Sequence, residues 1–220
     1  MLLVQCDFDD TITIGNVSNA IKAAFGTREL RLIEKEYHRG KLSVEETNIK
    51  QFGLLKSAVE SIEDFVLSEV IIRDGFSNFV HYCLHSKVRL VVVSSGLDLY
   101  IHPILKRDRL DTLEVHSGKA HVTENGINVK YPDPTSNKIV HGFKESFLRK
   151  FKSDGNAIAY IGDGLSDIIP ASEADFVIAK STLQKHLESR NIQHYGFETF
   201  TDVIKILEAI QKTTGFELGQ

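Results

Sequence analysis

The first eleven residues restrict the possible folds of this chain more than any other stretch. An apolar run covers residues 1–4, and Asp7, Asp9, Asp10 and Thr11 follow within a few positions. Carboxylates at the end of a buried strand cost free energy unless a cation or hydrogen bonds compensate for them. Asp7 and Asp9 would face opposite sides of a flat strand, but a chain that curls at the strand end brings both to one ion. Taken alone, the stretch is equally compatible with a turn that caps a helix.

Composition narrows the class of protein. The 220 residues are 42% hydrophobic with a net charge of −4, which predicts one sizeable domain with a small companion and no surface for nucleic acid. Cys6 and Cys83 lack CxxC spacing and are expected to be reduced thiols. The apolar start is too short to be expected as a signal peptide, and no apolar run reaches about 18 residues. We therefore expect a cytoplasmic protein that binds no membrane; the sequence carries no signal for its oligomeric state.

Strand and helix patterns alternate along most of the chain, which favours an α/β fold with a doubly wound, Rossmann-like parallel sheet. Residues 88–93 are β-branched and apolar apart from Arg89, as in a strand buried on both faces. We also expect strands at 113–115, 157–161 and 176–179, a hairpin of 119–122 and 127–131 turning at Asn125-Gly126, and helices at 75–86, 97–106, 143–151, 168–174, 183–188 and 201–211.

One interval in this alternation is too long. Between Thr11 and Ser94, which end successive predicted strands, lie 82 residues, whereas a βαβ unit needs about 30. Residues 15–70 contain only helical patterns, expected at 17–25, 27–39, from the capping box Ser43-Val44-Glu45-Glu46 onward, and at 61–70. We predict a small helical cap over residues 15–70, placed where ligands bind in open α/β sheets, on a core of residues 1–14 and 71–220.

Polar residues follow several of the predicted strands on one edge of the sheet: Asp7, Asp9 and Thr11; Ser94 and Ser95; Lys144 at a helix start; and Asp163 and Asp167. Four close carboxylates repel one another, so a divalent cation is expected, and all-oxygen ligands suit Mg²⁺. A lysine and hydroxyls can hold a phosphate, one carboxylate can attack phosphorus, and a second can protonate the leaving oxygen. The combination favours phosphoryl transfer.

The stretch Asp7-Phe8-Asp9-Asp10-Thr11 resembles the DxDxT motif of the haloacid dehalogenase (HAD) superfamily. Ser94, Lys144 and residues 162–167 resemble its second, third and fourth motifs, in the same order. The resemblance covers essentially the whole chain. It implies a Rossmann-like sheet with a helical cap, and Mg²⁺-dependent hydrolysis of a small phosphorylated metabolite through an aspartyl phosphate.

The resemblance also implies a role for each residue. Asp7 would be the nucleophile, and Asp9 the general acid and then the base for water; an acid at this position goes with phosphatases, not ATP-driven pumps. The metal would be held by Asp7, the backbone carbonyl of Asp9 and Asp163, with support from Asp167. The phosphoryl group would be held by Thr11, Ser94, Ser95 and Lys144. Asp10 stands where the family often has glycine, and is expected to be a turn residue.

The substrate prediction depends on the cap. Its length and the motif order are similar to phosphoserine phosphatases, but the positions that would grip the amino acid hold the neutral amides Asn16 and Gln51. Segments 52–55, 65–67 and 72–76 are more similar to the enol-phosphate phosphatase of methionine salvage, which acts on 2-hydroxy-3-keto-5-methylthiopentenyl-1-phosphate. Residues 135–143 lack the cysteine-rich run that this branch can carry.

Three alternatives to the enol-phosphate phosphatase remain open from the sequence. They are a phosphoserine phosphatase, a phosphotransferase that uses the same site with an alcohol as acceptor, and a non-catalytic protein that binds a phosphorylated ligand. All motif positions are filled, which disfavours the non-catalytic protein.

Overall fold

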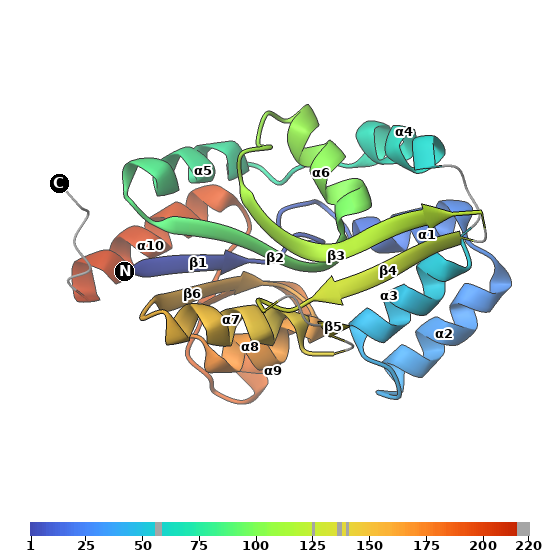
Figure 1. Ribbon diagram of the computed structural model, residues 1–220. Coiled ribbons are helices and arrows are strands. Elements are labelled where there is room, and N and C mark those ends of the chain that lie inside the picture. The colour runs from blue at the N-terminus through green and yellow to red at the C-terminus, as the bar shows by residue number, and fades with distance from the viewer. Residues whose placement is uncertain (56–58, 125, 136–137, 140, 215–220) are drawn as a thin grey trace.

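The computed structural model describes residues 1–55, 59–124, 126–135, 138–139 and 141–214. Their strands form one sheet in the order β5-β4-β3-β2-β1-β6-β7-β8 (Figure 1). The strands are β1 (Leu2–Cys6), β2 (Arg89–Leu97), β3 (Glu114–Thr123), β4 (Gly126–Pro132), β5 (Lys138–Ile139), β6 (Ala157–Gly162), β7 (Phe176–Ala179) and β8 (Tyr195–Gly196). All neighbouring strands pair in parallel except β3 with β4 and β4 with β5.

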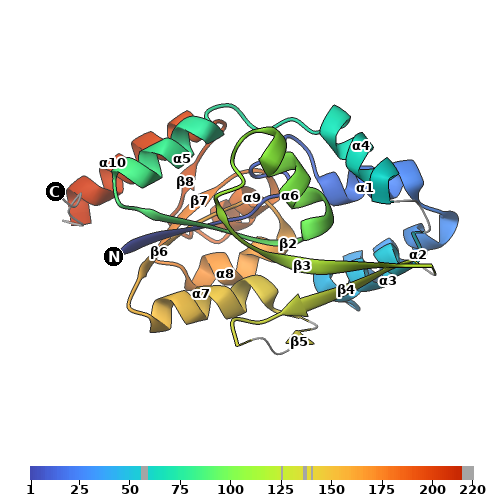
Figure 2. The same ribbon diagram turned by 45° about the horizontal axis from the view of Figure 1, so that its top comes forward.

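The strand that carries the first acidic motif lies at the centre of this sheet. β1 pairs with β2 on one side and β6 on the other, and all five of its residues are buried. Helices cover both faces, with α5, α6 and α10 on one side and α7 and α8 on the other (Figures 1 and 2). The predicted α/β, Rossmann-like fold is therefore confirmed. No helix in the described part of the chain is both long and apolar enough to cross a membrane.

Every expected helix is present, with ends that differ from the sequence prediction by at most three residues. The helices are α1 (Val17–Phe25), α2 (Arg28–His38), α3 (Val44–Gly53), α4 (Val59–Glu69), α5 (Phe76–His85), α6 (Asp98–Arg107), α7 (Phe143–Ser153), α8 (Ile168–Glu173), α9 (Ser181–Ser189) and α10 (Phe200–Thr214). The predicted capping box forms at α3, where Ser43 Oγ accepts from the Glu46 N–H at 3.0 Å and Glu46 Oε2 accepts from the Ser43 N–H at 2.9 Å.

The strand predictions need three corrections. The separate strands expected at 113–115 and 119–122 are one continuous strand, β3, that passes through Gly118. A side chain there is excluded, because a Cβ on Gly118 would lie 2.7 Å from the Leu97 side chain and 2.8 Å from the Tyr131 ring. The short strands β5 and β8 were not predicted, since two residues are too few for any periodicity. Of the expected hairpin turn, Asn125 lies outside the described residues.

Helices α1–α4 lie between β1 and α5 in the sequence and beside the carboxyl end of β1 in space (Figure 1). The two chain segments that join them to the sheet are fastened together. Thr13 pairs with Ile72 in an antiparallel bridge. The Arg73 guanidinium donates to the backbone carbonyls of Asp10 at 2.7 Å, Thr11 at 2.8 Å and Thr13 at 3.0 Å. We call α1–α4 the roof and the sheet edge below it the floor.

Candidate active site

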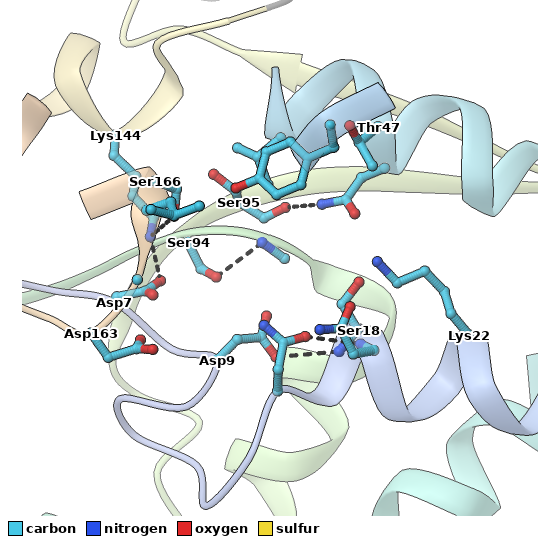
Figure 3. Close-up of a pocket in the computed structure, with 18 of the residues that line it drawn as sticks. Asp7, Asp9, Ser18, Lys22, Thr47, Ser94, Ser95, Lys144, Asp163 and Ser166 are labelled. Carbon is cyan, nitrogen blue, oxygen red and sulfur yellow. Dashed lines mark hydrogen bonds and ion pairs between the residues drawn. The ribbon is translucent and has the colours of Figure 1, made fainter. Parts of the chain in front are cut away.

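Three neighbouring parallel strands bring distant polar residues to one edge of the sheet. β1 ends directly before Asp7, β2 contains Ser94 and Ser95, and β6 ends directly before Asp163. Because β1 pairs in parallel with both neighbours, the carboxyl ends of the three strands lie side by side. Lys144, in the first turn of α7, points into the same space (Figure 3). The structure thus brings together the residues that the sequence motifs singled out.

Lys144 links the two acidic parts of the site. Its Nζ lies 2.9 Å from Asp7 Oδ1, 2.6 Å from Asp167 Oδ1 and 3.1 Å from Ser166 Oγ. Burial alone would lower the pKa of this lysine, but the carboxylates of Asp167 and Asp7 outweigh burial and raise it well above its usual value. Lys144 is therefore a permanent cation that fixes one oxygen of Asp7, and no hydrogen bond to Asp7 Oδ2 is seen within the described residues.

The carboxylates outnumber this cation. One oxygen each of Asp7, Asp163 and Asp167 lies within 4.8 Å of the others, and all three residues are buried. Burial and the nearby Asp167 together raise the pKa of Asp7 to about 7, against the lowering effect of Lys144, and they raise the pKa of Asp163 to about 8. A divalent cation would reverse this by favouring the ionised carboxylates. The cluster therefore has the ligands and the excess negative charge of a metal site.

The members of this cluster are not equivalent. Asp167 is fully buried and uses both oxygens within the protein: Oδ1 accepts from Lys144 and the Tyr160 hydroxyl, and Oδ2 accepts from the backbone N–H groups of Asp163 and Gly164. Asp7 and Asp163 line the cavity, whereas Asp167 does not. The sequence predicted Asp167 as a metal ligand with a supporting role. In the structure its carboxylate holds the turn that contains Asp163.

Thr11 acts on the same acid from the other side. Its fully buried hydroxyl donates to Asp163 Oδ1 at 2.9 Å. The sequence prediction gave Thr11 to the phosphate, but its side chain orients Asp163 and does not line the cavity. Asp10 adopts the expected left-handed turn with φ 59°. Its carboxylate lies 3.7 Å from Arg73 and 3.8 Å from Lys180.

Asp9 joins the floor to the roof. Its Oδ1 accepts from the N–H groups of Val17 at 2.8 Å and Ser18 at 3.4 Å, at the start of α1, and its Oδ2 accepts from the Tyr100 hydroxyl at 2.6 Å. Burial raises the pKa of Asp9, while the hydrogen bond from Tyr100 lowers it. Space here requires glycine at position 96, since a Cβ there would lie 2.2 Å from the Tyr100 hydroxyl and 2.7 Å from Asp9 Oδ2.

The last residues of β2, which the sequence predicted as a turn after the strand, supply hydroxyl groups. Ser94 Oγ accepts from the Gly96 N–H at 3.0 Å. Ser95 Oγ is buried and has no hydrogen-bond partner in the described part of the chain. The Ser95 carbonyl accepts from Asn48 Nδ2 on α3 at 2.8 Å and from the Tyr131 hydroxyl on β4. The roof is thus bonded directly to the residue that presents an unpartnered hydroxyl to the site.

A cavity of about 140 Å³ lies between floor and roof, and its walls are polar on both sides. The floor side contains three acids and Lys144, together with residues 94–96 of β2 (Figure 3). The acids are Asp7, Asp9 and Asp163. The roof side contains Asn16, Ser18, Asn19, Lys22, Glu34, Tyr37, Val44, Thr47 and Asn48. A second cleft of about 550 Å³ shares Tyr37, Val44, Lys144 and Leu165 with this cavity and adds the apolar side chains Leu42 and Ile169.

The two positions that the sequence comparison gave to substrate recognition differ in the structure. Asn16 lines the cavity and caps α1, accepting from the Asn19 N–H at 2.8 Å. Gln51 is buried beneath Lys22 and does not line the cavity. Sequence reasoning missed Tyr100, Ser18, Lys22 and Asn48. Their contacts depend on how the roof packs on the floor, and only the spacing of Ser18 and Lys22 on one helix offered a local signal.

Comparisons with known proteins agree with this geometry. The profile of the haloacid dehalogenase-like hydrolases matches residues 4–170. The 2-hydroxy-3-keto-5-methylthiopentenyl-1-phosphate phosphatase of Brevibacillus brevis is 32% identical over 215 residues, covering 96% of this chain and 97% of that protein. Its counterpart in Geobacillus thermodenitrificans is 31% identical over 214 residues, with the same coverage.

Solved structures agree on the fold. A substrate-bound phosphoserine phosphatase has a TM-score of 0.71 at 21% identity, and a phospho-aspartyl intermediate analogue of phosphoserine phosphatase has a TM-score of 0.72 at 21% identity. Each match covers 93% of this chain and 97% of the other. The chain therefore belongs to the haloacid dehalogenase-like hydrolase family. Within that family it is a phosphatase.

Proposed function

We propose that this phosphatase hydrolyses 2-hydroxy-3-keto-5-methylthiopentenyl-1-phosphate through a phosphoaspartyl intermediate on Asp7. The observation that carries the proposal is the pairing of Asp7 and Asp9 around one cavity, with Lys144 holding one oxygen of Asp7 and leaving the other free to attack. The substrate is inferred from full-length relatives with that activity in their names.

Asp7 and Asp163, with the backbone carbonyl of Asp9, would hold Mg²⁺. The donor set fits, because the buried carboxylates exceed the available positive charge and oxygen ligands suit this ion. When bound, Mg²⁺ would neutralise phosphate oxygens and keep Asp7 ionised. Asp167 and Thr11 would act through Asp163 by fixing its turn and its side chain.

The chain's own groups account for the proton transfers. Asp7 Oδ2 attacks phosphorus, the phosphorus–oxygen bond to the substrate breaks, and Asp9 gives its proton to the departing oxygen. Asp9 then takes a proton from water as the water attacks the aspartyl phosphate, which frees Asp7 and releases phosphate. Burial favours the protonated form of Asp9 that the first step needs. Lys144 and the Ser94-Ser95 hydroxyls would hold the phosphoryl oxygens throughout.

We further propose that residues 15–70 form a cap that selects the leaving group. Roof side chains form the wall of the cavity opposite the acids. Glu45 on α3 accepts from the Phe143 N–H at 3.1 Å, and Asn48 donates to the Ser95 carbonyl, so the cap is attached to the floor by buried hydrogen bonds. The second cleft places Leu42, Leu165 and Ile169 beside the charged Glu45, Glu145 and Arg149, and its apolar side chains offer surface for the methylthio tail of the enol phosphate.

The test is phosphate release by the purified protein with Mg²⁺ from a panel of compounds. The panel contains the enol phosphate, phosphoserine, a sugar phosphate, a nucleotide and phenyl phosphate. We expect the highest kcat/KM on the enol phosphate, and loss of all activity in Asp7→Asn, with the exposed Asp154→Asn as matched control. A higher kcat/KM on phosphoserine would contradict the substrate, and unchanged turnover in Asp7→Asn would contradict the nucleophile.

A further inference from the structure

Helix α1 presents two hydrogen-bond donors to the cavity that the protein does not fully use. Ser18 and Lys22 are four residues apart, so they lie on one face of the helix, and both line the cavity (Figure 3). Ser18 is 5% exposed, and its hydroxyl has no hydrogen-bond partner in the part of the chain that the structure describes. A buried hydroxyl without a partner costs free energy, which a ligand atom can restore.

Lys22 is a half-buried cation with few partners. Its side chain is 12% exposed, its Nζ donates to the neutral Gln51 Oε1 at 2.9 Å, and the nearest carboxylate oxygen, on Glu34, is 3.9 Å away. The Gln51 amide is itself fixed, since Nε2 donates to Glu34 at 2.9 Å and to the Leu30 carbonyl at 3.1 Å. Burial lowers the pKa of Lys22, which reflects this shortage of compensating charge. The roof therefore holds an ammonium group beside the cavity with donor capacity to spare.

The proposed substrate has a matching acceptor. Its phosphate is on C1, a hydroxyl on C2 and a ketone on C3, with the double bond between C1 and C2. When the phosphorus–oxygen bond breaks, the electron pair left on the C1 oxygen spreads through the double bond to the C3 carbonyl oxygen. Negative charge therefore develops at two places, one at the scissile oxygen and one remote from phosphorus.

We propose that Lys22, with Ser18 beside it, donates hydrogen bonds to the carbonyl oxygen conjugated with the scissile bond and thereby selects enol phosphates of this type. The inference rests on the function proposed above and adds a second point of charge stabilisation to it. The bond from Asp7 to phosphorus forms and the bond from phosphorus to the C1 oxygen breaks. The proton of Asp9 goes to the C1 oxygen, while Lys22 keeps its own proton and stabilises the C3 oxygen.

The position of α1 supports these separate roles for Asp9 and Lys22. The N–H groups of Val17 and Ser18 hold Asp9, and Lys22 lies one helical turn beyond Ser18. The proton donor and the ammonium are thus held by a single rigid helix. A donor stabilises the transition state most when it is aimed at charge that develops during the reaction.

The test compares Lys22→Met with wild type on the enol phosphate and on phenyl phosphate, whose leaving group has no carbonyl. We expect kcat/KM on the enol phosphate to fall about 10- to 100-fold, mostly through kcat, because a charge-assisted hydrogen bond is lost. The loss on phenyl phosphate should be at least about tenfold smaller, because the residue then has no acceptor. Lys22→Arg should recover part of the loss, and Lys35→Met, on the exposed face of α2, should match wild type.

Ser18→Ala is a second, smaller variant that tests the same donor set without removing a charge. We expect it to lower kcat/KM on the enol phosphate about threefold to tenfold, and to lower it less on phenyl phosphate. Equal losses on both compounds in Lys22→Met and Ser18→Ala would mean that these residues are structural, and would overturn the inference. A wild-type preference for the enol phosphate that survives in Lys22→Met would overturn the inference alone. A wild type without that preference would overturn the proposed substrate, and the inference with it.

Discussion

Lys144 in the floor is buried and Lys22 in the roof is half-buried; both lysines line the same cavity, and they differ in their partners. Lys144 contacts two carboxylates and a hydroxyl within 3.1 Å, and its pKa is raised despite burial. Lys22 has one neutral amide within 3 Å, and burial lowers its pKa. The floor lysine is thus fully paired within the protein and is suited to one fixed reaction, whereas the roof lysine keeps donor capacity available for a substrate.

The largest effect should come from removing the floor cation. Lys144→Met leaves Asp7 and Asp167 buried without their shared partner, which should cost about 3–5 kcal/mol of unfolding free energy. Activity on every phosphate should fall about 1,000-fold. Urea denaturation and phosphate release measure the two effects. Lys150→Met, which removes an exposed ion pair from the same helix, is the control and should leave both quantities unchanged. A stable, active Lys144→Met protein would remove the distinction between the two lysines.

The second prediction concerns metal and pH. Without metal, the raised pKa values of Asp7 (about 7) and Asp163 (about 8) mean that the folded state binds more protons than the unfolded chain. The metal-free protein should therefore lose stability as pH rises from about 4 to about 8. Because Mg²⁺ binds ionised carboxylates, its effect on Tm should increase over the same range.

Melting curves with EDTA or Mg²⁺ at several pH values between 5 and 8.5 test this, and EDTA should also lower activity about 100-fold or more. A Tm that Mg²⁺ leaves unchanged at pH 8 would argue against a metal at the cluster of Asp7, Asp163 and Asp167. The pH dependence of the Tm increase distinguishes metal binding to these carboxylates from a general effect of salt, which would be the same at every pH.

A smaller effect is expected where roof and floor meet. Tyr100→Phe removes the hydroxyl that donates to Asp9 Oδ2, so kcat should fall about tenfold on all phosphates. Since that hydrogen bond lowers the pKa of Asp9, its loss should raise this pKa and move the alkaline limb of the kcat–pH profile to higher pH. Tyr82→Phe, whose hydroxyl bonds to Gln211, is the control. A limb that moves to lower pH would contradict the proton-donor role of Asp9.

The smallest change in activity should come from a substitution in the second cleft. Ile169→Ser removes an apolar side chain near the proposed tail site, so KM for the enol phosphate should rise about threefold to tenfold. Phenyl phosphate lacks the tail and should be affected less. Ile71→Ser changes an isoleucine of similar exposure that lies outside both cavities, and should have no effect. Equal changes on both compounds would place the tail elsewhere.

The floor was predictable because its residues follow buried strands whose pattern is local. The apolar stretch at 88–93 and the acids after β1 and β6 identify strand ends, and parallel pairing then requires them to meet. The family resemblance supplied roles that spacing alone does not. Even so, Thr11 and Asp167 turned inward to hold Asp163, because a buried carboxylate needs donors that only the folded chain reveals.

The roof was predictable in its helices but not in its contacts. The spacing of apolar residues identifies each helix locally. The orientation of one helix against another depends on contacts between residues far apart in the sequence, such as Gln51 and Leu30. Gln51, which aligned with a recognition position of phosphoserine phosphatases, supports Lys22, and Lys22 was not identified from the sequence. Tyr100 was missed for the same reason, since its partner Asp9 lies 91 residues away.

The Arg73 clamp has an evolutionary consequence. The chain passes between sheet and helices along two adjoining segments, and Arg73 donates all its hydrogen bonds there to backbone carbonyls, with the Asp10 carboxylate 3.7 Å away. These hydrogen bonds do not require particular side chains at positions 11 and 13. Helices beyond the clamp can accumulate substitutions, lengthen or be replaced while the sheet keeps its register. Such an attachment lets the preference for a leaving group change while the catalytic residues of the sheet edge stay the same. We therefore expect positions 13 and 72 to be suitable boundaries for exchanging helices α1–α4 between relatives.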